Sequence, residues 1–323
     1  MLKFLKDWML PIAIVLGIVS YMILYLVPEL AENVEPGFSA FAKNIQPVLM
    51  AIMLFLQFNK ISPHDLKFRR WHLVALAIQV VLFVVFAWVA VMLPDGTGKI
   101  LAECAMLCFV CPTAAAAGVV TNKLGGSLSD TVSYVVLINV AAAFIIPLVI
   151  PLFNSSPDAT FFRSFSAICM KIFPLLVMPL LVAWLIRYTV RPLQRWLMRY
   201  ADWAFYVWGG ALTFAIYLAT RALVTSGISV WGAILIALVS LACTLIQFAV
   251  GRAAGRVLAK NDDELMLDSI TAGQALGQKN SGFLIWLGYS YLTPVTSVAG
   301  GLYSIWQNLI NSMELFEYGH RKK

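Results

Sequence analysis

Ten long apolar stretches follow one another along the 323-residue sequence and limit what it can fold into. Their approximate ranges are 8–27, 40–58, 71–93, 99–122, 128–153, 162–187, 203–224, 229–251, 265–290 and 293–316. A helix that crosses the hydrocarbon core of a membrane needs about 20 apolar residues. Only 12% of the residues are charged, whereas soluble domains carry about 25%. The sequence therefore predicts an all-α polytopic membrane protein with about ten transmembrane helices, and it excludes a soluble enzyme.

The charges between these stretches predict how the helices are oriented. The first connection carries three glutamates, Glu29, Glu32 and Glu35, whereas the second and every alternate connection after it are basic. Basic connections stay on the cytoplasmic side of a membrane. The basic residues of that side are Lys3, Lys6, Lys60, Lys67, Arg69, Arg70, Lys123, Arg187, Arg191, Arg195, Arg199, Arg252, Arg256, Lys260, Arg321, Lys322 and Lys323. We expect a multi-pass protein of a bacterial-type inner (plasma) membrane with both termini in the cytoplasm.

The same basic groups account for the net charge of +7. They are short and scattered between apolar stretches instead of forming one continuous surface, which argues against a nucleic-acid partner. The sequence indicates the lipid bilayer as the surroundings of the chain, and it shows no sign of an obligate protein partner.

The spacing of polar residues indicates an internal repeat within this single transmembrane unit. Gln79 precedes Pro112 by 33 residues, and Gln247 precedes Asn280 by 33 residues. Transporters are often built from two inverted halves that each contribute an interrupted helix. We expect two inverted five-helix repeats, one over residues 1–155 and the other over residues 156–323.

Two of the apolar stretches contain signals for a broken helix. Pro112 removes a backbone hydrogen bond in the fourth stretch, and the ninth stretch contains the polar, glycine-rich run from Gly273 to Gly282. Unwound backbone inside a membrane is tolerated only where protein buries it or water reaches it. Two such breaks at matching places predict a cavity between them, and the alternative is a simple proline kink together with a polar helix interface.

Lys279 lies deep inside the ninth stretch and is the strongest candidate for a functional residue. A charged side chain near the bilayer centre costs about 2.5 kcal/mol or more, so such residues are functional hypotheses by default. The alternative is a lysine that reaches the membrane surface along a broken helix. The expected neighbours of Lys279 are four glutamines, Gln79, Gln247, Gln274 and Gln278.

Three of the five cysteines, Cys104, Cys108 and Cys111, share one helix face. Such a face could bind a soft metal or arsenite, but packing of small residues between helices is the favoured interpretation. The sequence contains no ligand spacing for a metal site and no constellation of catalytic residues. We therefore expect a protein that is not an enzyme and holds no metal and no cofactor.

Three motifs resemble those of the bile acid:sodium symporter family. They are Cys111–Val120 in the fourth stretch, Gly277–Gly282 in the ninth and Gly301–Asn308 in the last. The resemblance covers essentially the whole chain. It implies a panel domain from spans one, two, six and seven, and a core domain from the other six. It also implies that the discontinuous spans four and nine cross at their breaks.

The departures from the family pattern concern its two sodium sites. Family members use a glutamate and a glutamine of span nine, whose places hold Ala275 and Lys279 here, and a serine-asparagine pair of span four, whose places hold Ala117 and Gly118. Sodium needs several oxygen ligands, as other hard cations do. By the same resemblance, Gln79 and Gln278 are further residues of the site that would bind the coupling ion.

These substitutions lead to the hypothesis that Lys279 replaces bound sodium. The protein would then be a sodium-independent secondary transporter of a small organic anion, such as a bile acid or small carboxylate, working by alternating access. Because burial disfavours the charged amine, Lys279 is also a candidate for coupling to protons. The residues expected to contact the substrate are Asn280, Ser281, Gln307, Thr113 and Ala115. The alternatives are an arsenite or metalloid exporter of the same superfamily that uses Cys111, and a ligand sensor that does not transport.

Overall fold

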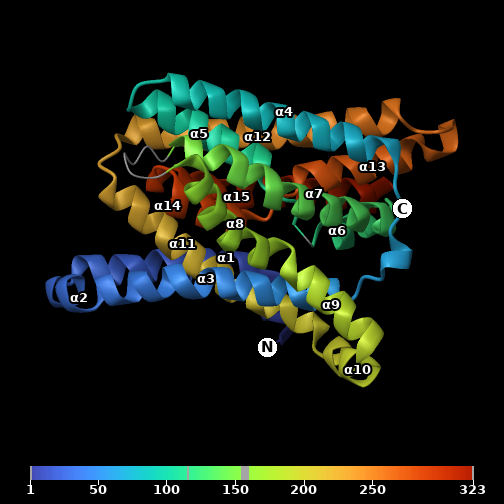
Figure 1. The fold of residues 1–323 in the computed structure, drawn as a ribbon, viewed down its shortest axis with the longest axis horizontal. Coiled ribbons are helices and arrows are strands. Elements are labelled where there is room, and N and C mark those ends of the chain that lie inside the picture. The colour runs from blue at the N-terminus through green and yellow to red at the C-terminus, as the bar shows by residue number, and fades with distance from the viewer. Residues whose placement is uncertain (1, 115, 154–159, 322–323) are drawn as a thin grey trace.

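The computed structural model describes residues 2–114, 116–153 and 160–321, and helices make up nearly all of this part (Figure 1). The α-helices are α1 (Leu2–Leu26), α2 (Pro28–Asn33), α3 (Glu35–Phe58), α4 (Arg70–Met92), α5 (Thr97–Val110), α6 (Ala117–Lys123), α7 (Leu128–Val149), α8 (Phe161–Leu176), α9 (Met178–Thr189), α10 (Arg191–Arg199), α11 (Ala204–Thr225), α12 (Val230–Val257), α13 (Asp262–Gly277), α14 (Ser281–Tyr291) and α15 (Val298–Arg321). Four short 3-10 helices join them, η1 (Pro63–Asp65), η2 (Ile150–Phe153), η3 (Ala201–Trp203) and η4 (Pro294–Ser297). The all-α class predicted from the sequence is confirmed.

Six helices of the described chain are long and apolar enough to cross a membrane, namely α1, α3, α4, α7, α11 and α12. The pair α8 and α9 is also long and apolar enough, and it makes a seventh candidate span if the two helices, bent by 44°, count as one. Pro179 at the start of α9 accounts for the bend, because proline cannot continue the hydrogen bonding of the preceding turn. The other three predicted spans coincide with the interrupted pairs α5/α6 and α13/α14, and with α15, which is long enough but carries several polar residues.

Side-chain caps fix where several of these helices begin. Ser127, Ser229 and Asn261 each precede a helix and accept a hydrogen bond from a backbone N–H group in its first turn. Such caps satisfy donors that would otherwise have no partner, which matters most where water is scarce. The helices that carry the site described below therefore start at defined residues.

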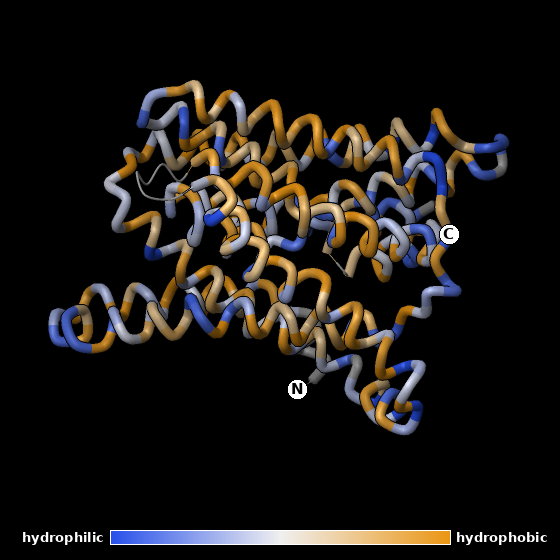
Figure 2. The backbone as a smooth tube through the Cα atoms, in the orientation of Figure 1, coloured by the Kyte–Doolittle hydropathy of each residue, from blue (hydrophilic) through white to orange (hydrophobic). Residues whose placement is uncertain are grey.

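The helices pack as two layers (Figure 1). We call α1, α3, α8, α9 and α11 the panel, because α11 packs against both α1 and α3, and α3 packs against α8 and α9. We call α4 to α7 and α12 to α15 the core, in which α12 packs against α5, α13 and α15. Apolar colour runs along the helices and hydrophilic colour collects at their ends (Figure 2). Outward-facing apolar side chains such as Leu16, Val81 and Leu238 are about half exposed, as expected for a surface that contacts lipid.

Two glycines bring α12 and α13 into close contact. A methyl group at Gly255 would collide with the carbonyl oxygen of Asp268, and one at Gly251 would collide with that of Ala272. Small residues of this kind allow helix backbones to approach closely in a membrane. The close contact holds α13, and thus the second helix break, against the longest helix of the core.

The inverted relation between residues 1–155 and 156–323 stays a prediction. The expected junction between the two repeats falls at residues 154–159, which lie outside the described residues.

Candidate functional site

The candidate site lies where the two interrupted helix pairs of the core cross. The first break, residues 111–116, separates α5 from α6, and the second, Gln278–Asn280, separates α13 from α14. The two breaks run side by side in opposite directions and pair through one isolated bridge between Thr113 and Lys279. The signals in the sequence at Pro112 and in the glycine-rich run thus mark real interruptions, and the structure brings them together.

Backbone hydrogen bonds hold the two breaks to each other. The N–H of Ala114 donates to the carbonyl of Gln278 at 3.0 Å, and the N–H of Asn280 donates to the carbonyl of Pro112 at 2.8 Å. Inside a membrane each unsatisfied backbone group costs several kcal/mol. The crossing removes this cost because each break supplies the partners that the other lacks.

Side chains from both breaks complete this attachment. The Thr113 hydroxyl donates to the carbonyl of Ala275 at 2.6 Å, and the Cys111 thiol donates to the carbonyl of Asn280 at 3.0 Å. Asn280 also caps α14 by accepting the N–H of Phe283 at 3.2 Å. Thr113 and Asn280 were expected to contact the substrate, and in this structure both have partners within the crossing.

Lys279 is fully buried at the crossing, with none of its surface exposed. Its terminal Nζ has no hydrogen-bond partner. The ionisable groups that act on this amine are the thiols of Cys111 and Cys108, and no carboxylate of the described residues does so. Burial without a partner excludes the alternative that Lys279 reaches the membrane surface, and it leaves the amine without an acceptor.

Gln307 of α15 holds the backbone of Lys279 from both sides. Its Oε1 accepts the N–H of Lys279 at 2.7 Å, and its Nε2 donates to the carbonyl of Lys279 at 3.2 Å. The N–H of Ser281 donates to the same carbonyl at 2.9 Å. Gln307 and Ser281, both predicted to touch the substrate, therefore lie at the lysine, and Gln307 uses both ends of its amide to fix it.

The glutamines expected to surround the Lys279 amine have other partners. Gln79 donates to the carbonyl of Cys111 at 3.1 Å and accepts the hydroxyl of Tyr134 at 3.0 Å. Gln247 donates to the carbonyl of Cys108 at 3.1 Å and to the hydroxyl of Tyr303 at 3.0 Å. Both glutamines thus hold the end of α5, and neither is bonded to the lysine.

Tyr303 of α15 links the end of α5 to the second break. Its hydroxyl accepts from Gln247 and donates to the carbonyl of Gly277 at 2.7 Å. Tyr303 lies within the motif Gly301–Asn308, and no role was predicted for it. A buried tyrosine in a polar last span is a signal, because its hydroxyl needs a partner.

A series of polar side chains leads from the second break to Glu314 of α15 and Arg252 of α12. Gln278 donates to Gln274, and Gln274 donates to Glu314 at 2.7 Å. Glu314 forms an ion pair with Arg252, and both line a cleft of about 200 Å³ between α12, α13 and α15. In this series of hydrogen-bonded side chains, Gln278, one of the predicted coupling residues, lies between the crossing and the cleft.

The positions that depart from the sodium-site pattern are buried and contribute no side-chain oxygen. Ala275 has no exposed surface, and its carbonyl is occupied by Thr113. The carbonyl of Ala117 accepts the hydroxyl of Thr121 at 2.8 Å, and Gly118 packs near Leu128. Ala115, the remaining residue expected at the substrate, lies outside the described residues.

The helix ends at the crossing have opposite electrostatic character. The carboxyl ends of α5 and α13 present carbonyl groups, whereas the amino ends of α6 and α14 present N–H groups. A helix carries a partial positive charge at its amino end and a partial negative charge at its carboxyl end. The crossing therefore offers both signs of partial charge close to the Lys279 amine, which suits a polar or charged ligand.

The cysteines do not form a metal site in the described part of the chain. Cys104, Cys108 and Cys111 are buried with free thiols. No group of three histidine, cysteine or acidic residues that could hold a metal ion occurs among the described residues.

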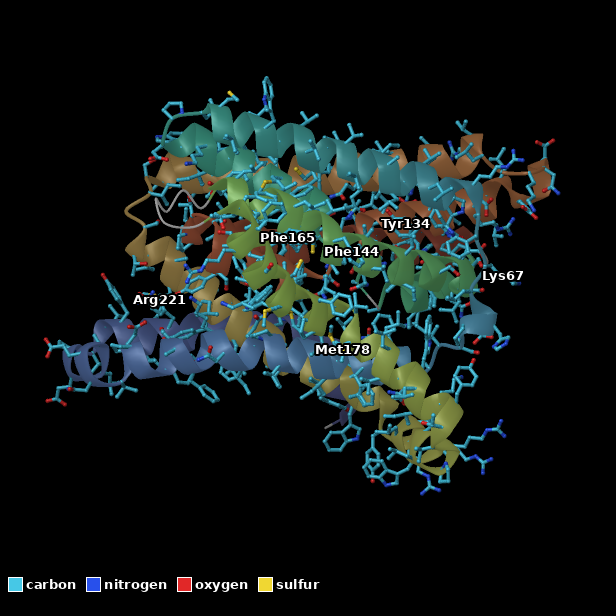
Figure 3. All side chains as sticks on the ribbon, viewed as in Figure 1. Lys67, Tyr134, Phe144, Phe165, Met178 and Arg221 are labelled. Atoms are coloured by element: carbon cyan, nitrogen blue, oxygen red, sulfur yellow. The ribbon has the colours of Figure 1, made fainter. Side chains whose placement is uncertain are left out.

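The core and the panel meet through two polar contacts near the site. Gln46 of α3 donates to the carbonyl of Gly282 at 2.9 Å. Arg221, which lies near one end of α11 (Figure 3), pairs with Glu35 at 2.6 Å and donates to the hydroxyl of Tyr289 at 3.0 Å. Gly282 and Tyr289 both belong to α14, so these contacts join the helix after the second break to the panel.

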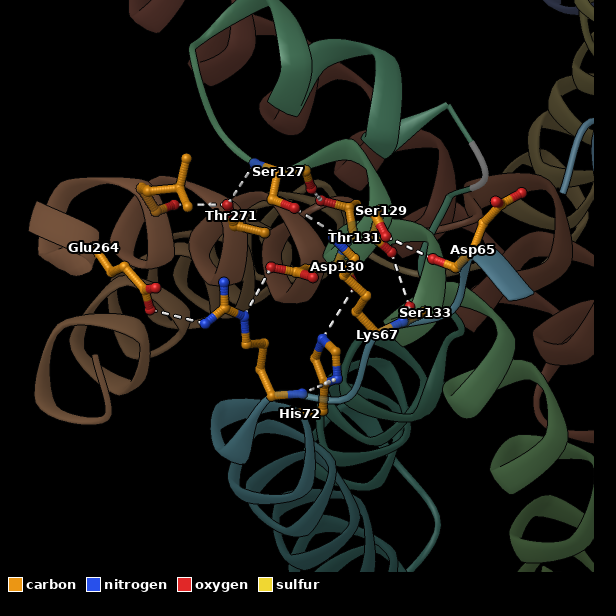
Figure 4. A network of polar contacts seen from close by, with 12 residues as sticks. Asp65, Lys67, His72, Ser127, Ser129, Asp130, Thr131, Ser133, Glu264 and Thr271 are labelled. Atoms are coloured by element: carbon orange, nitrogen blue, oxygen red, sulfur yellow. Dashed lines mark hydrogen bonds and ion pairs between the residues drawn. The ribbon is translucent and has the colours of Figure 1, made fainter. Parts of the chain in front are cut away.

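A second polar network fixes the basic end of the core (Figure 4). Arg69 pairs with Asp130 of α7 at 3.1 Å and with Glu264 of α13 at 2.8 Å. Burial opposes the charge of Arg69, but the carboxylate of Asp130 raises its pKa above the usual value. His72 bonds to the backbone carbonyl of Asp130 at 3.0 Å. The network links α4, α7 and α13. It holds the first turn of α13, which is the end of that helix opposite the crossing.

Taken together, these features define a polytopic membrane transporter, and its candidate site lies where the two helix breaks cross. The chain belongs to the SBF-like CPA transporter family, whose profile matches residues 8–271. This family covers the superfamily of the bile acid:sodium symporters, so the resemblance seen in the sequence is confirmed at that level. The matched range includes the first break and ends before Lys279. No curated protein matches the chain.

Proposed function

We propose that this protein is a secondary transporter of a small organic anion, such as a bile acid or small carboxylate, and that Lys279 takes the place of a bound sodium ion. The observation that carries the proposal is the Nζ of Lys279, which is fully buried at the crossing and has no hydrogen-bond partner. It is supported by the membership of the chain in a transporter family.

An amine in this position has two ways to avoid the cost of an unpaired buried charge. It can bind the carboxylate of a substrate, because a charge-assisted hydrogen bond offsets much of the desolvation cost. It can also release its proton, since burial favours the neutral form. A transport cycle that alternates between these two states would couple anion movement to proton movement without sodium.

The residues around the crossing argue against a retained sodium site. Ala275, Ala117 and Gly118 contribute no side-chain oxygen, and the carbonyls of the two alanines already accept hydrogen bonds. A hard cation needs several oxygen ligands. A fixed ammonium needs none, and it would repel a second cation at this place.

Alternating access would require the core to move against the panel. In the state described here, α14 is held by Gln46 and by Arg221 of the panel. We propose that these two contacts break and re-form during the cycle while the paired breaks travel with the core.

The ion requirement can be tested without knowing the substrate. We would measure the thermal unfolding of the purified protein in sodium and in choline at equal ionic strength, for the wild type and for the Ala275→Glu/Lys279→Gln variant. A ligand that binds only the folded state raises the melting temperature by mass action. We expect no sodium-specific rise in the wild type, and such a rise would refute the replacement of sodium by Lys279.

Uptake measurements test the transport step itself. We would load vesicles with the protein, impose a pH gradient and screen organic anions, comparing Lys279→Met with Lys171→Met. Lys171 is exposed on α8 and serves as a matched lysine. We expect Lys279→Met to abolish pH-driven uptake and Lys171→Met to retain it. Persistent pH-driven accumulation in Lys279→Met would exclude proton coupling through this residue, and ligand binding without uptake in the wild type would favour a sensor.

A further inference from the structure

The short helix α10 (Arg191–Arg199) lies apart from both layers, beyond the end of α9 (Figure 1). None of its nine residues is buried. It follows the sixth span on the side of the chain where basic residues collect. Its surroundings must therefore come from outside the described chain.

The sequence of α10 separates into two faces. At about 100° per residue, Arg191, Arg195 and Arg199 fall within roughly 80° of one another. Leu193, Trp196 and Leu197 occupy the opposite side of the helix. This arrangement is typical of helices that lie in the plane of a membrane surface with the apolar face inserted.

The positive charge of α10 is concentrated: three of its nine residues are arginines and none is acidic. The acidic residue closest in sequence is Asp202, which pairs with Lys60 at 2.9 Å. An anionic headgroup outside the chain would complement this stripe of three arginines.

Aromatic rings fix the depth at which this region meets the membrane. Trp196, Tyr200, Trp203 and Tyr206 follow one another with ring centroids 4.9, 6.4 and 6.3 Å apart. Trp196 and Trp203 are half exposed or more. Tryptophan and tyrosine collect at membrane–water interfaces because one part of the ring is apolar and the other is polar.

We propose that α10 lies in the headgroup layer of the cytoplasmic leaflet and binds anionic phospholipids. The guanidinium groups of the stripe would bind lipid phosphates, to which their planar donors are matched, while Leu193 and Trp196 insert among the acyl chains. Anionic lipids attract basic residues near the surface strongly enough to change binding about fivefold for each residue. The site would anchor the panel to the bilayer while the core moves.

The experiment uses the purified full chain in a zwitterionic detergent. It would be titrated with short-chain phosphatidylglycerol, short-chain phosphatidylcholine or inorganic phosphate at equal ionic strength, and its melting temperature recorded. The test variant is Arg191→Gln/Arg195→Gln/Arg199→Gln. The control variant is Arg70→Gln/Lys123→Gln/Lys260→Gln, which removes three exposed positive charges elsewhere on the same side of the molecule.

Phosphatidylglycerol should stabilise the wild type and the control at low concentration, whereas phosphatidylcholine and phosphate should not. The test variant should need on the order of 100-fold more phosphatidylglycerol for the same shift. An unchanged titration in the test variant would overturn the proposal. An equal loss of the phosphatidylglycerol response in the control variant would show that the response depends only on the total positive charge. An equal shift in melting temperature with inorganic phosphate would show a site for a free anion instead of a lipid.

Two further variants keep the proposal testable if the triple substitution does not fold. Arg195→Gln alone should weaken the response about fivefold, and Arg191→Lys/Arg195→Lys/Arg199→Lys should keep most of it. A wild type that shows no response to phosphatidylglycerol but binds an acidic protein through α10 would replace the lipid by a protein partner. None of these measurements depends on transport, so their failure would leave the proposed function untouched.

Discussion

The buried amine of Lys279 leads to a prediction about stability that runs opposite to the usual effect of core substitutions. Lys279→Met replaces the amine by an apolar group of similar length and flexibility, which can fill the same space. An unsatisfied buried polar group costs about 1–3 kcal/mol, and more if it is charged. The free energy of unfolding should therefore rise by about that amount, while anion transport is lost.

This gain corresponds to a measurable shift in melting temperature. With an unfolding entropy of about 2.1 cal/mol/K per residue, a chain of 323 residues should melt roughly 1.5–4.5 °C higher. Tryptophan fluorescence during heating provides the assay, and Lys171→Met provides the control. Lys171 lies over the ring of Tyr291 at 5.9 Å, so its loss should lower stability slightly. A Lys279→Met protein that melts below the wild type would show that the amine has a stabilising partner and would refute the reasoning.

Three further predictions concern the packing and the hydrogen bonds around the site. Gly255→Ala should destabilise the protein by more than about 2 kcal/mol or prevent folding, because the new methyl group collides with α13. Gly37→Ala, where nothing lies within 4 Å of the new methyl group, should instead stabilise it by about 0.5–1 kcal/mol; thermal unfolding checks both. Gln307→Leu should cost about 1–3 kcal/mol, because the backbone N–H of Lys279 loses its partner while its carbonyl keeps the N–H of Ser281, and no loss in chemical denaturation would contradict the bonds described. A double-mutant cycle with Arg221→Gln and Tyr289→Phe should give a coupling of about 0.5–1.5 kcal/mol if the panel and core are bonded there, and additive effects would argue against that contact.

The elements of the fold were predictable because the membrane imposes length and composition on them. Each of the ten apolar ranges contains helix in the structure, and the two breaks fall where proline and the polar run interrupt the apolar pattern. The sequence indicated α10 less clearly. Arg191 to Arg199 were interpreted as part of a basic connection, although the four-residue spacing of the arginines already matches a helix face.

The partners within the site were harder to predict than its location. Gln79 and Gln247 were expected near the Lys279 amine, but they bond to backbone carbonyls of α5 instead. Arg221 joins Glu35 and Tyr289, which lie on two other helices far apart in the sequence. A sequence shows which side chains are polar, but the free backbone carbonyls that attract them arise only when the helices are broken and brought together.

The pairing of the two breaks has a consequence for how such proteins diversify. Thr113 and Lys279 face each other through a bridge made of main-chain atoms, and the neighbouring Ala114 and Asn280 contribute N–H groups instead of side chains. Every residue type except proline can supply those atoms. Side chains at the crossing can therefore be exchanged over evolutionary time without removing these main-chain hydrogen bonds, so the same scaffold can acquire a different set of polar groups there by a few substitutions.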